Sequence, residues 1–265
     1  MIKKVIVITG YWKSGTTLLQ FLLAKHPNID NIFPRDDINY DGHLFWKKYL
    51  PPLKPRNGHT IPKELYEKIN KKEILNQLES WAKTDTILLK RPQFVDNIDF
   101  LQYLFEDYDL RIIGMKRDII PNIYSMMKLR KRNGYGIKIL SGHAYYDCQK
   151  DVFKPPLKRL CLQYKYANES LDRDDIFIYT YEDICDNTEQ SAKDIGNYIG
   201  EKLDWSNVTV ENKNMQYKTG ANLRSDNEYT SKNILCTDER EKDFPPFTSR
   251  QLQELKHYME ELCLN

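Results

Sequence analysis

Short runs of apolar residues, rich in β-branched side chains, recur along the chain, and polar segments with helical spacing separate them. The four clearest runs lie at Val5–Thr9, Thr86–Leu89, Leu110–Met115 and Ile176–Thr180. Each is apolar at successive positions, which is typical of strands buried on both faces of a parallel sheet. The intervening pattern predicts helices over Thr16–Lys25, Lys71–Trp81, Asn97–Phe105, Pro121–Arg130, Leu157–Leu171, Glu189–Tyr198 and Ser249–Leu262.

This alternation of strands and helices predicts an α/β fold, with a central parallel sheet and helices on both of its faces. The 265 residues suit one domain over 1–265. Residues 30–85 and 131–156 form long connections, and residues 205–248 are polar with little periodicity. Long connections of this kind often carry function. In such sheets, ligands bind beyond the carboxyl ends of the strands.

Composition narrows the class of protein. Apolar residues make up 40% and charged residues 29% of the chain, which predicts a packed core. The net charge of +2 argues against a nucleic-acid partner. No apolar stretch is long enough for an export signal or a membrane span, so we expect a cytoplasmic protein without membrane association. Five scattered cysteines without a Cys/His cluster predict reduced thiols and no metal site.

A glycine-rich loop, GYWKSGTT, follows the first predicted strand and opens the first helix. Backbone N–H groups at a helix start bind phosphate oxygens, and the helix dipole favours negative charge there. Nucleoside-triphosphate enzymes place a lysine after the second glycine, where it reaches the outer phosphates. Here Thr16 stands at that position and Lys13 comes earlier. The displaced lysine favours a substrate with a single 5′-phosphate and no need for Mg²⁺.

A second motif, in RIIGMKRDIIPNIYSMM, begins where the third predicted strand ends. Arg117 follows the strand and Ser125 lies in the next helix. A guanidinium and a hydroxyl suit a second, separate phosphate. Taken alone, the pair is equally consistent with a salt-bridged arginine and a helix serine. Together with the glycine loop, it indicates a nucleotide that carries phosphates at two distant positions.

KSGTT after a strand, followed by R-x7-S at a later strand end, resembles the sulfotransferase family, and the likeness extends over most of residues 5–200. The resemblance implies a P-loop-like fold and 3′-phosphoadenosine-5′-phosphosulfate (PAPS) as donor, with adenosine 3′,5′-bisphosphate (PAP) as product and no metal. It implies that the 5′-phosphosulfate is bound by Lys13, Ser14, Gly15, Thr16 and Thr17. It further assigns the 3′-phosphate to Arg117 and Ser125, with Lys218, Thr219 and Gly220 closing on it. The segment IYTYEDICDN places Tyr181 near the adenine.

The resemblance also suggests catalytic roles. Lys13 would stabilise the leaving phosphate, and Lys90, in LLKRP, would support the transferring sulfuryl group. LLKRP lacks the histidine base of cytosolic members and resembles carbohydrate-type and bacterial members, which place a carboxylate base after the first helix. Asp37 is the best match to that base, with Asp36 and His43 as alternatives. The two aspartates are equally consistent with capping a turn or helix. Leu18 replaces the tryptophan of cytosolic members, so adenine stacking must come from elsewhere.

The long connections at 30–85 and 131–156 are expected on the acceptor side. Asp36, Asp37 and Asp41 make the first of them acidic, which favours a cationic small molecule with a hydroxyl or amine to be sulfated. The alternative is a solvated acidic loop. Aromatic residues in these connections are either walls of the acceptor site or simply core. They are Phe45, Trp46, Tyr135, Tyr145 and Tyr146.

Two other functions stay open at this stage. A magnesium-dependent kinase or other P-loop phosphotransferase would bind ATP with Mg²⁺. A non-catalytic nucleotide-binding module would bind the donor without turnover. The sequence favours neither O- nor N-sulfation, and no particular oligomeric state.

Overall fold

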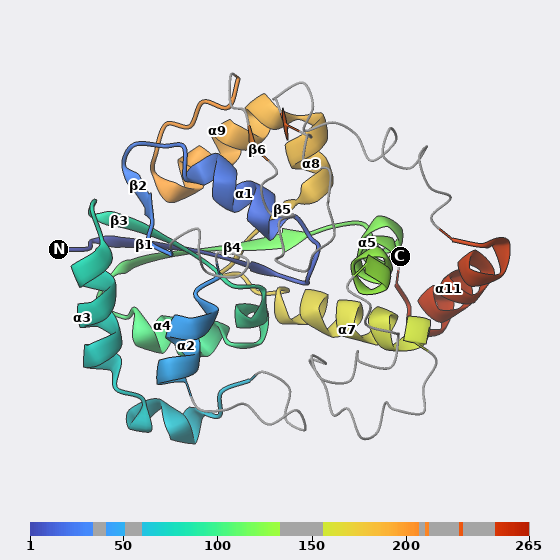
Figure 1. Cartoon of the computed structure of the whole chain (residues 1–265), viewed down its shortest axis with the longest axis horizontal. Helices are drawn as coiled ribbons and strands as arrows, with labels where there is room; N and C mark the ends of the chain where they lie inside the picture. Colours follow the sequence, from blue (N-terminus) through green and yellow to red (C-terminus); the bar gives the residue numbers. More distant parts are fainter. Residues whose placement is uncertain are drawn as a thin grey trace.

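Five parallel strands form the central sheet of the protein in a computed structural model (Figure 1). The structure describes residues 1–33, 41–50, 60–132, 156–206, 210–211, 228–229 and 247–264. The strands are β1 (Lys4–Gly10), β2 (Ile29–Asn31), β3 (Thr86–Lys90), β4 (Asp109–Lys116) and β5 (Phe177–Thr180). Their order in the sheet is β2-β3-β1-β4-β5. The first strand of the chain is therefore the central one.

Helices cover both faces of this sheet, as the sequence predicts (Figure 1). The α-helices are α1 (Thr16–Leu23), α2 (His43–Tyr49), α3 (Lys71–Trp81), α4 (Ile98–Leu104), α5 (Ile119–Arg132), α7 (Pro156–Ser170), α8 (Tyr181–Asp186), α9 (Thr188–Ile199) and α11 (Ser249–Glu261). Two 3-10 helices, η3 (Lys63–Lys68) and η4 (Pro92–Asp96), and a small hairpin of β6 (Val210–Glu211) and β7 (Glu228–Tyr229) complete the described elements.

The side chains of β1 explain why helices pack on both faces of the sheet. Val5 and Val7 pack into the cluster that contains α4, α5 and α7, whereas Ile6 and Ile8 pack with α1, α8 and α9. All four side chains are fully buried. A strand that is apolar at successive positions is stable only between two layers of helices, because successive side chains point to opposite faces.

The predicted α/β architecture is thus confirmed, and the four predicted strands appear close to their expected bounds. The short elements β2, α2 and α8 were not predicted. β2 has only three residues, too few for a periodic pattern. α8 begins directly after β5 because the Thr180 side chain accepts a hydrogen bond from the backbone N–H of Asp183.

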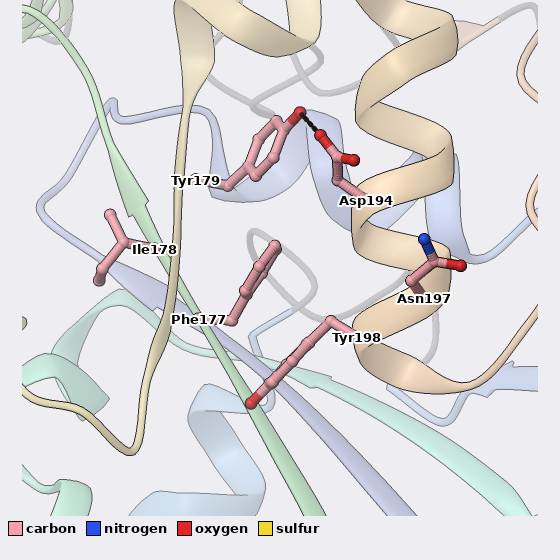
Figure 2. Close-up of a pocket in the computed structure, with 6 residues that line it drawn as sticks. All are labelled: Phe177, Ile178, Tyr179, Asp194, Asn197 and Tyr198. Atoms are coloured by element: carbon pink, nitrogen blue, oxygen red, sulfur yellow. Dashed lines mark hydrogen bonds between the residues drawn. The ribbon is translucent and has the colours of Figure 1, made fainter.

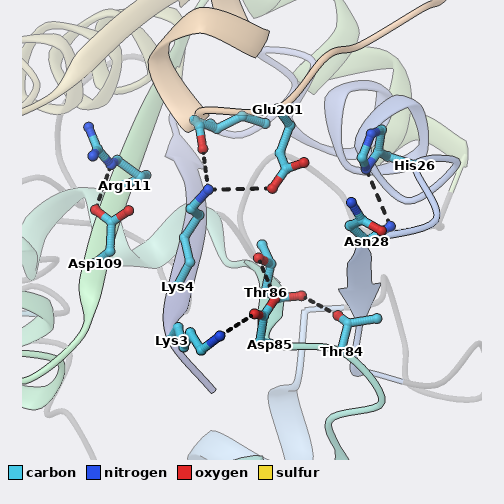
Figure 3. Close-up of polar contacts among 11 residues, drawn as sticks. Lys3, Lys4, His26, Asn28, Thr84, Asp85, Thr86, Asp109, Arg111 and Glu201 are labelled. Atoms are coloured by element: carbon cyan, nitrogen blue, oxygen red, sulfur yellow. Dashed lines mark hydrogen bonds and ion pairs between the residues drawn. The ribbon is translucent and has the colours of Figure 1, made fainter. Parts of the chain in front are cut away.

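Polar contacts link the amino ends of the strands, at the edge of the sheet opposite to the carboxyl ends (Figure 3). The Lys4 ammonium donates to the carbonyl of Ile199 at 2.6 Å and lies 3.4 Å from a carboxylate oxygen of Glu201. It therefore binds the carboxyl end of α9, where a cation is favourable. Nearby, Lys3 pairs with Asp85 at 3.1 Å, which joins β1 to the start of β3. These contacts stabilise the ends of the strands and of α9, and they lie away from the carboxyl ends of the strands.

The carboxyl group of Asp96, the last residue of η4, is partly buried and contacts α7. One carboxyl oxygen accepts from the Ser170 hydroxyl at 3.4 Å. The other is buried and has no hydrogen-bond partner within the described part of the chain. Burial raises the pKa of Asp96 to about 7. Below a pH of about 7, the folded protein therefore favours the protonated form of Asp96.

We expect Asp96→Asn to remove a pH-dependent loss of stability. The carboxyl group has an ordinary pKa of 3.8 and a folded pKa of about 7. Its stabilising contribution is complete below the ordinary value and is lost as the pH rises through the folded value. Between these values, the free energy of unfolding of wild type should fall relative to the variant by up to about 4 kcal/mol. Urea unfolding across this range measures the difference. Asp174→Asn, at an exposed position, is the control, and equal pH profiles for all three proteins would contradict the prediction.

Candidate active site

The carboxyl ends of the strands meet at one edge of the sheet. In register, Ile8 of β1 lies beside Lys90 of β3, and Lys116 of β4 lies beside Thr180 of β5. The Arg91 N–H donates to the Ile8 carbonyl at 3.0 Å, so the chain after β3 stays against β1. The loops that follow β1, β3 and β4, and the start of α8 directly after β5, therefore leave the sheet side by side. This is the edge at which parallel sheets bind ligands.

The glycine loop after β1 has unusual backbone angles at three residues. Gly10, Lys13 and Gly15 all have positive φ, at 145°, 68° and 93°. Lysine adopts the left-handed region only at a cost of roughly 1–2 kcal/mol. The N–H and the hydroxyl of Ser14 both donate to the Tyr11 carbonyl, at 3.2 and 2.6 Å. The loop is therefore closed internally before the chain enters α1.

Gly15 caps α1 without a side-chain hydrogen bond to the first turn. The first N–H groups of this helix thus have no acceptor from the capping side chain, and the positive end of the helix dipole lies at the loop. Thr16 is buried and Thr17 is partly exposed in the first turn. A Cβ atom on Gly15 would stand 2.6 Å from Cδ2 of Tyr181, so the loop packs directly against the start of α8. The sequence-predicted residues of the loop and Tyr181 are therefore brought together.

Arg117, the first residue after β4, connects these segments. Its Nη1 donates to the Lys13 carbonyl at 3.2 Å, and its guanidinium lies 4.3 Å from the centre of the Tyr181 ring. Its Nε is 3.9 Å from a carboxylate oxygen of Glu182. The backbone carbonyl of Arg117 accepts from the Tyr164 hydroxyl at 2.7 Å. The arginine predicted for a second phosphate is therefore also a structural contact of the glycine loop.

Sequence reasoning gave no role to Tyr164 and Glu182. Tyr164 comes from α7, which the sequence predicts only as a helix, and no motif marks it. Burial raises its pKa to about 12, so its hydroxyl stays a proton donor toward Arg117. Glu182 lies inside the quoted segment around Tyr181, where only the tyrosine was assigned a role. Burial also raises the pKa of Glu182 above its usual value.

The remaining predicted residues fall into two groups. Lys90, at the end of β3, is 1% exposed, and Ser125 lies on α5, about two turns beyond Arg117, with its side chain partly exposed. The others lie outside the described residues, or have only their backbone described in the case of His43. These are Asp36, Asp37, His43, Lys218, Thr219 and Gly220, together with the aromatic residues Tyr135, Tyr145 and Tyr146.

The aromatic residues of α2 belong to the core. Trp46 is fully buried, and its ring centre lies 4.9 Å from that of Phe94. Phe45 is 8% exposed and packs edge-on against Trp46 at 4.8 Å. The interpretation of these two residues as core, rather than as exposed walls, is thus confirmed. Among the residues described, no group of His, Cys, Asp or Glu side chains is arranged to hold a metal ion.

An open groove of about 620 Å³ lies elsewhere, between β5 and α9 (Figure 2). The rings of Phe177 and Tyr198 stack there at 4.5 Å, and the Tyr179 hydroxyl donates to Asp194 at 3.3 Å. None of its lining residues is a sequence-predicted site residue. They are Phe177, Ile178, Tyr179, Asp194, Asn197 and Tyr198. Along the described helices, none is long and apolar enough to cross a membrane.

The glycine loop, Arg117 and Tyr181 all lie in the part of the chain that matches a known family. A family model described as "Sulfotransferase family" matches residues 5–206, from β1 to just beyond α9. The chain belongs to the sulfotransferase family. The matched region contains the central sheet and all of the contacts of Arg117 given above. No curated protein matches this sulfotransferase significantly.

Solved structures similar to this sulfotransferase share little sequence with it. A sulfotransferase from Alicyclobacillus acidocaldarius is 16% identical, with a TM-score of 0.49 over 77% of this chain and 83% of that one. Sulfotransferase STF9 from Mycobacterium avium is 13% identical, with a TM-score of 0.49 over 98% and 77% of the two chains. Retinol dehydratase in complex with androsterone and the inactive cofactor PAP is 14% identical, with a TM-score of 0.39 over 99% and 81%.

We expect Gly15→Ala to destabilise this sulfotransferase more than Gly200→Ala. Both glycines have positive φ, but a Cβ on Gly200 meets only the end of the Lys4 side chain at 3.4 Å, whereas one on Gly15 meets the Tyr181 ring at 2.6 Å. The steric contact should add about 1–3 kcal/mol to the backbone strain that both variants share. Urea unfolding of the two variants and wild type checks this. Equal losses would show that the loop does not depend on its packing against Tyr181.

Proposed function

We propose that the protein transfers a sulfuryl group from PAPS to a hydroxyl or amine of a small-molecule acceptor. Membership of the sulfotransferase family supports the reaction class. The observation that carries the choice of donor is the hydrogen bond from Arg117 to the Lys13 carbonyl. It joins the anion-binding loop at the start of α1 to a second cation at the end of β4. A donor with a 5′-phosphosulfate and a separate 3′-phosphate needs both.

The residues present fit such a donor. The glycine loop leaves the start of α1 without a side-chain cap, as an incoming phosphate requires. The Nε of Arg117 is buried and has no hydrogen-bond acceptor among the described residues. A buried guanidinium N–H without an acceptor is unfavourable, and a phosphate oxygen would satisfy it. The uncapped start of α1 supports our assignment of the 5′-phosphosulfate to Lys13, Ser14, Gly15, Thr16 and Thr17, and the buried Nε supports a second phosphate at Arg117.

We assign the 3′-phosphate to Arg117 and Ser125, and the adenine side to Tyr181. The Tyr181 ring packs against both the loop and the guanidinium, which supports this assignment. The segment Lys218, Thr219 and Gly220 is proposed to close on the 3′-phosphate; it lies outside the described residues. This arrangement requires no magnesium, because each phosphate position has its own cation.

PAPS supplies the sulfuryl group and a phosphate leaving group when it is bound. The ammonium group of Lys13 would neutralise charge on the leaving oxygen, because a positioned cation stabilises charge that develops in the transition state. Lys90 is removed from water at the end of β3, where it supports the sulfuryl oxygens. Asp37 or Asp36 takes the proton from the acceptor, with His43 as the alternative base.

The acceptor we propose is a small cationic molecule, such as an amine or a guanidinium compound. Asp36, Asp37 and Asp41 lie on one connection that follows β2. Asp41 is only 7% exposed, so it does not belong to a solvated acidic surface. Preferential turnover of anionic acceptors would contradict this part of the proposal.

The donor is tested by calorimetric titration of adenosine 3′,5′-bisphosphate without metal, and of ATP with Mg²⁺. We expect the bisphosphate to bind wild type, and Arg117→Ala to weaken it by roughly 1.5–3 kcal/mol, the value of a hydrogen bond to a charged group. Arg111→Ala is the control, since Arg111 pairs with Asp109 at the amino edge of the sheet. Tighter binding of ATP with Mg²⁺ would identify a phosphotransferase instead.

Turnover is tested with Lys13→Met. Because Lys13 acts on the leaving phosphate, kcat with radiolabelled PAPS and an amine acceptor library should fall roughly 100-fold or more. Lys25→Met, an exposed lysine just beyond α1, should retain wild-type turnover. Binding of the bisphosphate without turnover by wild type would indicate a non-catalytic nucleotide-binding module. An unchanged kcat in Lys13→Met would remove the catalytic role of this lysine.

A further inference from the structure

Glu182 faces the guanidinium of Arg117 from the first turn of α8. One of its carboxylate oxygens accepts from the Asp118 backbone N–H at 3.3 Å and lies 3.9 Å from Arg117 Nε. Elsewhere on Arg117, Nη1 donates to the Lys13 carbonyl and the Tyr181 ring lies against one face of the guanidinium. Glu182 lies on the Nε side of the cation.

The distance makes this an ion pair without a hydrogen bond. At 3.9 Å the carboxylate neutralises Arg117 but leaves its buried Nε–H without an acceptor in the described part of the protein. An oxyanion that accepts a hydrogen bond from Arg117 would therefore stabilise the guanidinium more than Glu182 does. The same oxyanion would come close to the carboxylate, and two like charges at a partly buried site repel each other.

We propose that Glu182 is an internal competitor for the 3′-phosphate of the donor at Arg117. In the free protein it holds the guanidinium beside the glycine loop. In the complex it opposes the phosphate and so weakens the binding of donor and bisphosphate product. This inference rests on the proposed function, because it concerns the same anion site. It assigns to Glu182 a positioning and affinity-setting role rather than a catalytic one.

Proton uptake should accompany binding. The groups around Glu182 are Arg117 and Asp118 from the turn after β4, Tyr164 from α7, and Cys185 on α8 itself. Burial raises the pKa of Glu182, and the Asp118 carboxylate raises it further, while Arg117 lowers it. An added phosphate would raise this pKa again, so at pH values near the pKa the Glu182 carboxyl group would be protonated to a greater extent in the complex than in the free protein. The affinity should accordingly decrease as the pH rises through the pKa of Glu182.

The test compares wild type, Glu182→Gln and Glu189→Gln. Glutamine keeps an oxygen for the Asp118 N–H but carries no charge, and Glu189 is an exposed residue of α9 that controls for net charge. Adenosine 3′,5′-bisphosphate should bind Glu182→Gln about three- to tenfold more tightly than wild type, the range for like charges at a partly solvated site. Calorimetry in two buffers of different ionisation enthalpy should show proton uptake in wild type that is reduced in Glu182→Gln. Protonation of the phosphate group contributes equally in wild type and Glu182→Gln, so the difference in proton uptake between them reports on Glu182.

Inorganic phosphate, titrated against the same proteins by thermal shift, separates this inference from the proposed function. Competition predicts tighter phosphate binding by Glu182→Gln than by wild type, whether or not the nucleotide binds. If the bisphosphate fails to bind wild type but phosphate still favours the variant, the donor assignment is wrong and the competition stands. If the bisphosphate binds wild type and Glu182→Gln equally well, or the variant less well, the competition is overturned and the donor assignment stands. Failure of phosphate to bind any of the proteins, or equal binding to all, also overturns the competition.

Discussion

The parallel pairing of β1 with β3 on one side and β4 on the other is the constraint on which the candidate site depends. Because helices cover both faces of this strand, its side chains from Val5 to Ile8 are fully buried and apolar. Polar chemistry is therefore confined to the places where the strands end. The register brings the end of β1 level with the ends of β3 and β4, so Lys90, the glycine loop and Arg117 leave the sheet together.

Much of this was predictable because it depends on local pattern. A run such as Val5–Thr9, apolar at successive positions, specifies a buried strand without knowledge of its neighbours. The glycine loop can be recognised in the sequence because it lies between that strand and a helix. Arg117 was found because it follows a strand in the same way. Each of these inferences uses residues that are close in sequence, and the sheet then brings the strand ends together by a general rule.

The rest of the site depends on contacts that no local pattern contains. Tyr164 is one of many polar residues on α7, and only the packing of that helix turns its hydroxyl toward the Arg117 carbonyl. Glu182 follows Tyr181 on α8, a helix too short to show a periodic pattern of apolar residues in the sequence. The left-handed backbone of Lys13 is equally invisible in sequence, because lysine does not favour it. The Arg117 hydrogen bond to the Lys13 carbonyl helps to hold that conformation, across 104 positions of sequence.

The central place of the first strand has a consequence for synthesis of the protein on the ribosome. β1 emerges first, yet its two neighbours in the sheet begin only at Thr86 and Asp109. The apolar side chains of β1 and its backbone N–H and C=O groups thus stay unpaired until β3 and β4 have been synthesised. Unpaired apolar strands are prone to associate with other chains. The nascent protein therefore passes through a period in which chaperone binding to residues 5–9 would protect the strand that later anchors the whole sheet.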